Sequence, residues 1–221
     1  MTAKSALIAG ATGLTGNELV KVLLEDPAYD KVKVLVRRTL DMDHPKLEEI
    51  KTDYYRLADY AEHFNVDDVF CCLGTTIKKA GSQKAFRRVD FDYPVAIAEL
   101  AKAAGVKNFL VISAMGADSR SNVFYSRVKG QMEDHLKKME FPALHIFQPS
   151  LLLGQREEFR LGEKAASLLA PAVSPLLRGG LKKYKPIEAH QVAVAMCAAA
   201  KSGSEGIVVH SSDKIAELAE K

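Results

Sequence analysis

A glycine-rich stretch near the start of the chain constrains the fold more than any other feature. An apolar run at residues 6–9 ends at Gly10, two more glycines follow at three-residue intervals, and residues 17–24 have helical periodicity. A strand, a glycine turn and a helix in this order let the backbone approach a pyrophosphate and point helix N-terminal N–H groups at its charge. The strand and helix favour this dinucleotide cradle over an ordinary turn with glycines at chance spacing. Its expected residues are Gly10, Thr12, Gly13, Leu14, Thr15 and Gly16.

Strands and helices alternate along the chain, which predicts an α/β fold with a doubly wound parallel sheet. Further strands are expected at residues 31–36, 47–51, 68–74, 108–113, 144–147 and 206–210, and helices at 82–104, 125–139, 188–200 and 213–220. Pro94 should bend or divide the first of these helices, and Asp213 should cap the last. The 221 residues fit one domain, with a cofactor-binding core at 1–150 and a small substrate or lid region at 151–221.

The ends of the second, third and fourth strands are expected at the edge where such a sheet binds its ligand. The second strand ends in Arg37 and Arg38, whose charge suits a 2′-phosphate and favours NADP(H) over NAD(H), although a solvated basic turn has the same composition. Asp53 follows the third strand and is a candidate for contacting adenine. The candidates for the adjoining ribose are Gly74 and Thr75, and Leu73 beside them is a further cofactor-binding candidate. Plain turn chemistry is the alternative for Asp53 and for the ribose candidates.

Three polar residues near the fifth strand suggest redox chemistry. Ser113 ends that strand, and Tyr125 and Lys129 lie four residues apart at the start of the next helix. This spacing puts the tyrosine and the lysine on one helix face, where an ammonium makes a phenol a better proton donor. With a hydride from the cofactor, the three side chains suit carbonyl reduction: Tyr125 gives the proton, Ser113 bonds the substrate oxygen, and Lys129 holds the nicotinamide ribose.

Composition limits which binding partners and which cellular location are expected for this chain. With 31 Lys+Arg against 28 Asp+Glu, the net charge of +3 gives no reason to expect nucleic acid or membrane binding, so a small carbonyl compound is the expected partner. Three cysteines make no disulfide framework, and the longest apolar run, residues 192–200, is too short for a membrane span. These observations predict a cytoplasmic protein. Oligomeric state stays open.

Two other chemistries have weaker support. A thiolate enzyme would need Cys71 or Cys72 exposed and activated, yet both lie in an apolar strand. The six histidines are dispersed without ligand spacing, so no metal site is predicted. His190 precedes an apolar helix, where packing is the favoured explanation for it.

The motifs resemble a known family. Residues 10–16, the serine of residues 113–117, and Tyr125 with Lys129 are similar to the atypical short-chain dehydrogenase/reductases. More narrowly, residues 72–76, 88–93 and 128–130 resemble the group around the HIV Tat-interacting protein. The resemblance implies a Rossmann fold, a nicotinamide cofactor and oxidoreductase activity. The family often has an asparagine that completes a proton relay where this chain has Asp90.

These observations support two hypotheses. The first is an NADP(H)-dependent oxidoreductase that reduces a small carbonyl substrate. The second is an NADP(H)-binding regulatory or redox-sensing protein with little turnover, because the family that this chain resembles also includes NADP-binding regulators. Substrate choice is expected to depend on residues 154–185, where the alternation of helix and strand weakens.

Overall fold

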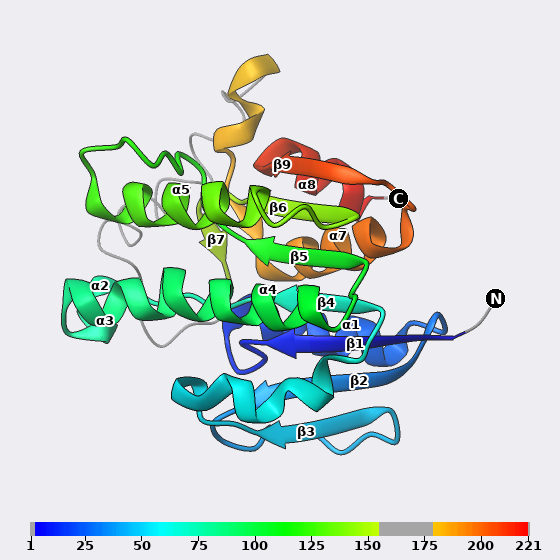
Figure 1. Cartoon of the computed structure of the whole chain (residues 1–221). Helices are drawn as coiled ribbons and strands as arrows, with labels where there is room; N and C mark the ends of the chain where they lie inside the picture. The colour runs from blue at the N-terminus through cyan, green and yellow to red at the C-terminus, as the bar shows by residue number, and fades with distance from the viewer. Residues whose placement is uncertain (1–2, 155–178, 221) are drawn as a thin grey trace.

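Seven parallel strands form one sheet in the order β3-β2-β1-β4-β5-β6-β9, as Figure 1 shows. The computed structural model describes residues 3–154 and 179–220. The strands are β1 (Lys4–Ala9), β2 (Tyr29–Val36), β3 (Leu47–Lys51), β4 (Asp68–Cys71), β5 (Asn108–Ile112), β6 (Ala143–Gln148) and β9 (Gly206–Ser211). Two short strands, β7 (Leu152–Leu153) and β8 (Ile187–Glu188), pair separately. The predicted doubly wound parallel sheet is confirmed.

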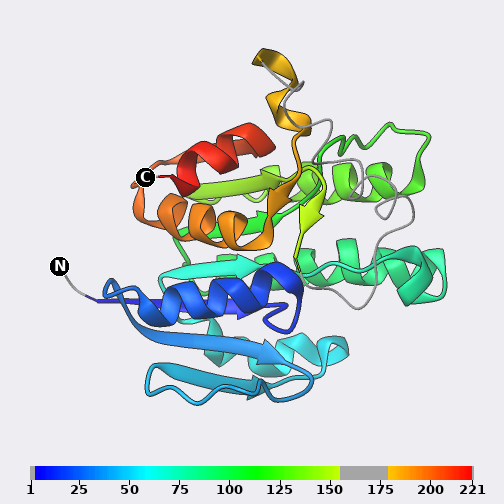
Figure 2. The same cartoon turned by 180° about the vertical axis from the view of Figure 1, so that it is seen from behind.

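Helices cover both faces of the sheet (Figures 1 and 2). One face packs against α1 (Leu14–Glu25), α7 (Ala189–Lys201) and α8 (Ser212–Ala219). The other packs against the 3₁₀ segment η1 (Tyr54–Phe64), α4 (Tyr93–Ala103) and α5 (Phe124–Lys137). The shorter elements are α2 (Ile77–Ala80), α3 (Gln83–Arg87), the π turn η2 (Arg88–Asp92) and η4 (Gly179–Tyr184).

The interior strand β1 explains why the chain needs two helical layers. Its side chains alternate between faces, with Ala6 and Ile8 in the core beneath α1, and Leu7 and Ala9 in the core beneath α4. All four are 0% exposed. A strand that is apolar on both sides is stable only when both sides are covered, which is typical of parallel sheets.

The helix predicted at residues 82–104 is divided, as the proline suggested. It consists of α3, the π turn η2 and α4, and Pro94 lies in the first turn of α4. The N–H of Tyr93 donates to the carbonyl of Arg88, five residues earlier. Proline has no N–H to continue the regular ladder, so a wider turn is accommodated just before it.

The predicted cap of the last helix is wrong. α8 begins at Ser212 with Ser211 as its N-cap residue, because the chain turns into the helix directly where β9 ends, two residues before the predicted cap. Asp213 lies in the first helical turn and accepts a hydrogen bond from the Ser211 hydroxyl. A carboxylate there still complements the helix dipole.

Most of residues 154–185, the predicted substrate-selecting region, lies outside the described residues. Within residues 3–154 and 179–220, each helix is too short or too polar to cross a membrane.

Candidate active site at the carboxyl edge of the sheet

A small cavity lies where β1, β4 and β5 end. These strands are neighbours in the sheet, and their carboxyl ends point the same way, as the arrowheads of β1 and β5 show in Figure 1. The cavity has a volume of about 50 Å³. Its walls include Gly13, Leu14, Leu73, Gly74, Ser113 and Lys129. The fold therefore brings into one cavity residues that are far apart in the sequence. They were predicted to form the dinucleotide cradle, to contact the ribose and to catalyse carbonyl reduction.

The glycine turn needs glycine for steric reasons at two positions. Gly10 has φ +88°, and a Cβ there would lie 2.7 Å from the backbone carbonyl carbon of Cys72. A Cβ on Gly16 would lie 2.1 Å from the carbonyl oxygen of Gly10. The absence of a Cβ at both positions lets the first turn of α1 lie close to the ends of β1 and β4, which is the close backbone approach that a dinucleotide site requires.

The N-terminus of α1 is chemically suited to an anion. Among the described residues, no side chain caps this helix at Gly13, and its first turn contains no acidic residue. Helix N–H groups and the positive end of the dipole therefore face no competing carboxylate from their own helix. The residues present fit the pyrophosphate of a nicotinamide dinucleotide.

Lys129 forms a buried ion pair with Asp90. The lysine is 2% exposed and the aspartate 0% exposed, and Nζ lies 2.8 Å from Oδ1. Asp90 also accepts a hydrogen bond of 2.9 Å from the N–H of Thr75, so it ties η2 to the loop after β4. Sequence reasoning identified Asp90 as a departure from the resembling family but missed this pairing. The charge of Lys129 is thus balanced from within the chain.

Ser113 is bonded to a carboxylate that sequence reasoning missed. The Ser113 Oγ lies 2.5 Å from Oε1 of Glu133, and the two residues are 4% and 3% exposed. The helical period that buries Val128 and Met132 also places residues 129 and 133 beside them. The sequence did contain a signal for this contact, because Glu133 lies four residues after Lys129 and beside the buried positions of α5.

Tyr125 lies in the first turn of α5, one helical turn before Lys129. The residue is half-buried, and its ring centroid lies 5.7 Å from that of Phe86. Ser113 and Lys129 line the same cavity, with Tyr125 on the helix that carries Lys129. The catalytic role of these three side chains remains a prediction.

The predicted adenosine-binding residues lie beyond the ends of β2 and β3. Arg37 and Arg38 are exposed after β2, and Asp53 is exposed after β3. The Asp53 carboxylate accepts a hydrogen bond of 3.0 Å from the N–H of Tyr55 and caps η1. Turn chemistry accounts for this contact, and the roles of all three residues in binding remain predictions.

The cysteines are poorly suited to thiolate catalysis. Cys71 and Cys72, at the end of β4, are free thiols. Burial raises the pKa of the Cys71 thiol to about 11, and burial also raises the pKa of Cys72 well above its ordinary value. Both thiols are therefore protonated near neutral pH, which disfavours the thiolate alternative.

Two of the histidines that seemed dispersed are neighbours in space. Nδ1 of His145 lies 3.0 Å from Nε2 of His210, because β6 and β9 pair side by side. Across residues 3–154 and 179–220, no group of three ligand-type side chains gathers to hold a metal. His190 is exposed and lies 3.1 Å from a carboxylate oxygen of Glu18.

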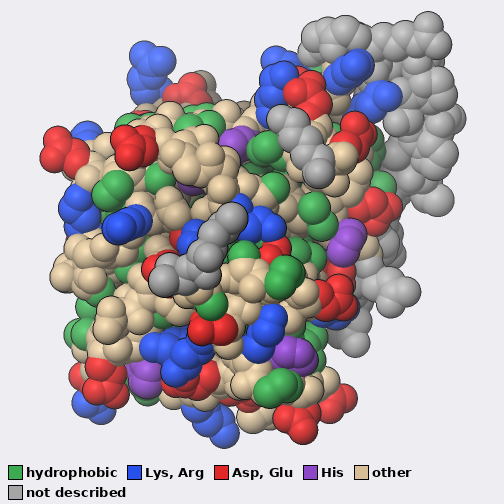
Figure 3. All heavy atoms as spheres, turned by 90° about the vertical axis from the view of Figure 1, so that its right-hand side faces the viewer, with side chains coloured by type: hydrophobic (Ala, Val, Ile, Leu, Met, Phe, Trp, Pro, Cys, Tyr) green, Lys and Arg blue, Asp and Glu red, His purple; other side chains and the backbone are tan. Residues whose placement is uncertain are grey.

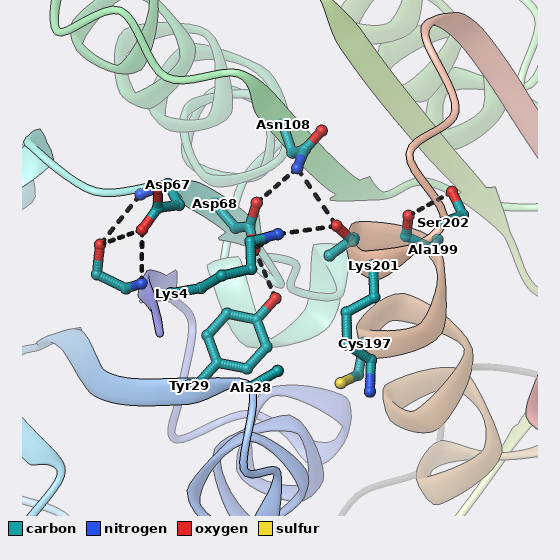
Figure 4. Close-up of polar contacts among 12 residues, drawn as sticks. Lys4, Ala28, Tyr29, Asp67, Asp68, Asn108, Cys197, Ala199, Lys201 and Ser202 are labelled. Carbon is teal, nitrogen blue, oxygen red and sulfur yellow. Dashed lines mark hydrogen bonds and ion pairs between the residues drawn. The ribbon is translucent and has the colours of Figure 1, made fainter. Parts of the chain in front are cut away.

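The amino edge of the sheet, opposite the candidate site, contains polar contacts that connect neighbouring strands. A larger hollow of about 540 Å³ lies there, beside Ser5, Lys31 and Glu48, away from every predicted site residue. Figure 3 views this edge, where acidic and basic side chains are interspersed. Within it, the buried Asp68 binds Lys4, Tyr29 and Asn108 (Figure 4). These bonds join β1, β2, β4 and β5 at their amino ends.

A doubly wound parallel sheet with a glycine turn at its carboxyl edge defines a Rossmann-type nucleotide-binding protein. The profile of a family described as NAD(P)H-binding matches residues 10–174. The chain belongs to this NAD(P)H-binding family.

Two curated relatives agree with this assignment. Protein HTATIP2 of Rattus norvegicus is 42% identical over 167 residues, which cover 74% of this chain and 69% of the relative. Protein FMP52, mitochondrial, of Candida albicans is 31% identical over 226 aligned positions, with 97% of this chain and 98% of the relative covered. The resemblance to the group around the HIV Tat-interacting protein is confirmed.

Solved structures agree on the fold. MoeE5 in complex with UDP-glucuronic acid and NAD has a TM-score of 0.72 at 19% identity, with 93% of this chain and 75% of that chain covered. The enzyme WbmH of Bordetella bronchiseptica, in complex with NAD+, has a TM-score of 0.73 at 17% identity, with 99% and 80% covered. The predicted Rossmann fold is confirmed.

The prediction of a cytoplasmic location is wrong. The FMP52 relatives of Scheffersomyces stipitis, Candida albicans and Debaryomyces hansenii are named mitochondrial proteins. The cysteine count on which the prediction rested does not distinguish one reducing compartment from another.

Proposed function

We propose that this chain is an NADP(H)-dependent oxidoreductase that reduces a small carbonyl compound. The observation that carries the proposal is the shared cavity, which the glycine turn, Ser113 and Lys129 all line. The N-terminus of α1 would hold the pyrophosphate of a dinucleotide at the carboxyl edge of the sheet, which is the edge where this cavity lies. The nicotinamide, when bound, supplies hydride to the carbonyl carbon.

Each candidate residue has a distinct task under this proposal. Arg37 and Arg38 bind the 2′-phosphate with charge-assisted hydrogen bonds, which selects NADP(H) over NAD(H). Lys129 holds the nicotinamide ribose, and Asp90 fixes the position of the lysine through their ion pair. Tyr125 donates a proton to the oxygen that becomes the alcohol.

A second candidate function is an NADP(H)-binding regulator with little turnover. It is favoured by a specific observation, namely that two of the polar groups facing the cavity already have partners within the chain. Ser113 is bonded to Glu133, and Lys129 is paired with Asp90. The same cofactor site then serves recognition rather than chemistry.

Replacement of Tyr125 by phenylalanine distinguishes the two functions. The assay follows NADPH oxidation with a panel of aldehydes, ketones and quinones, for the wild type, Tyr125→Phe and the control Tyr60→Phe. Loss of the proton donor should lower kcat by about 10²–10⁴-fold with NADPH affinity unchanged. The control removes a phenolic oxygen from η1 and should leave kcat unchanged. Equal turnover by Tyr125→Phe and the wild type contradicts the catalytic assignment, and NADPH binding without any turnover supports the regulator.

A further inference from the structure

Glu133 is a buried carboxylate on α5 that contacts a cavity-lining residue. Ser113 is the member of the pair that lines the cavity, and its Oγ lies 2.5 Å from Oε1 of Glu133. Both residues are almost fully buried, at 4% and 3% exposure. The pair therefore links the cavity to a charge inside the protein.

The neighbours of Glu133 identify which group donates. The amide nitrogen of Gln148 lies 2.9 and 3.1 Å from the two carboxylate oxygens, and Nζ of Lys137 lies 3.4 Å from Oε2. The amide and the ammonium both bring donor hydrogens to this carboxylate, so its oxygens act as acceptors. The hydroxyl of Ser113 is likewise the donor in its bond with Oε1 of Glu133.

This direction determines what Ser113 can offer a substrate. A serine hydroxyl has one proton and two lone pairs. With its proton held by Glu133, Ser113 presents only lone pairs to the cavity. A carbonyl oxygen also presents only lone pairs, whereas an alcohol hydroxyl has a proton to donate.

We propose that Glu133 is a positioning residue that fixes Ser113 as a hydrogen-bond acceptor, so that the site binds the alcohol form of its substrate more tightly than the carbonyl form. The inference rests on the proposed function, because it assumes that a carbonyl–alcohol pair occupies the cavity. It differs from the role expected from the sequence, in which Ser113 bonds the oxygen of a carbonyl substrate. Ser113 instead recognises the hydroxyl of the alcohol.

Binding in unreactive complexes tests the proposal without turnover. Propan-2-ol is titrated into the protein with NADPH, and acetone into the protein with NADP+, because neither mixture can react and both probes are small. The wild type should bind propan-2-ol about tenfold more tightly than acetone, as expected for one hydrogen bond. In Glu133→Gln and in Ser113→Ala, this ratio should fall to about one.

The control variant is Asp134→Asn, which removes the same charge from the neighbouring position of α5. Its carboxylate is half exposed and lies 3.9 Å from Nζ of Lys137. It should keep the tenfold ratio. Equal binding of the two probes by the wild type, or an equal change in Asp134→Asn and Glu133→Gln, overturns the proposal.

A second measurement does not need a ligand. A serine proton held by a buried carboxylate exchanges slowly with water and should give a downfield hydroxyl resonance in the proton NMR spectrum of the free protein. The resonance should be absent in Ser113→Ala and Glu133→Gln and present in Asp134→Asn. Its absence from the wild type, or its persistence in Glu133→Gln, overturns the proposal. Failure of both nicotinamide cofactors to bind contradicts the proposed function alone, and the resonance then decides the role of Glu133.

Discussion

Removal of the Asp90 carboxylate should destabilise the protein through the lysine that it leaves behind. The Asp90 and Lys129 side chains are 0% and 2% exposed, with 2.8 Å between their charged atoms. In Asp90→Ala, the ammonium stays buried without this counter-charge. Loss of one partner from a buried pair costs about 3–5 kcal/mol of unfolding free energy. That loss is a large share of the roughly 5–15 kcal/mol that stabilises a typical domain.

The assay is urea unfolding without cofactor, with thermal unfolding as a second measurement. A loss of about 3–5 kcal/mol corresponds to a fall in Tm of roughly 6–20 °C for a domain of this size. The control Asp92→Asn changes an exposed carboxylate in the same π turn and should stay within about 0.5 kcal/mol of the wild type.

A double variant separates the ion pair from simple packing. Asp90→Leu combined with Lys129→Met removes both charges and should be less destabilising than the sum of the single changes, because no buried charge is left unpaired. A loss below about 1 kcal/mol in Asp90→Ala, or strict additivity in the double variant, would refute the reasoning.

The remaining predictions concern stability and reactivity. Burial and the neighbouring histidine lower the pKa of His210 to about 4, below its unfolded value, so acid should protonate the unfolded state first. The wild type should therefore lose about 2 kcal/mol of unfolding free energy between pH 7 and pH 5, and His210→Phe should lose much less, as measured by urea unfolding. Gly16→Ala should destabilise the protein by roughly 1–3 kcal/mol or more, since its Cβ would meet the Gly10 carbonyl at 2.1 Å, whereas Gly74→Ala, with 3.5 Å to its nearest atom, should cost less. Because the pKa of Cys71 is raised to about 11, iodoacetamide should alkylate this thiol in the native protein far more slowly than in urea, and fast native labelling would contradict its burial.

The sequence predicted most of the fold because strands and helices here follow local patterns. The strand expected at residues 47–51 is β3, with the same bounds, and the helix expected at residues 125–139 is α5, which spans Phe124–Lys137. The last helix was less accurate because Ser211, Ser212 and Asp213 are all good N-cap residues. Its true start depends on where β9 ends, and that depends on pairing with β6.

The candidate site was only partly predictable. The glycine turn, Ser113 and Lys129 share a cavity as expected, because parallel strands bring their carboxyl ends to one edge. The partners of Ser113 and Lys129 were not predicted. Glu133 and Asp90 reach them from other elements, and such contacts depend on how α5 and η2 pack, which periodicity within one segment does not specify.

The central claim is that the glycine turn and the basic end of β2 bind NADP(H). The most direct test compares thermal unfolding with NADPH and with NADH, for the wild type and for the double variant Arg37→Ala/Arg38→Ala. At 100 times its dissociation constant, a ligand that binds only the folded state adds about 2.7 kcal/mol of stability. NADPH should stabilise the wild type more than NADH does at equal concentration, and the double variant should lose this difference. Greater stabilisation by NADH, or no stabilisation by either cofactor, would contradict the claim.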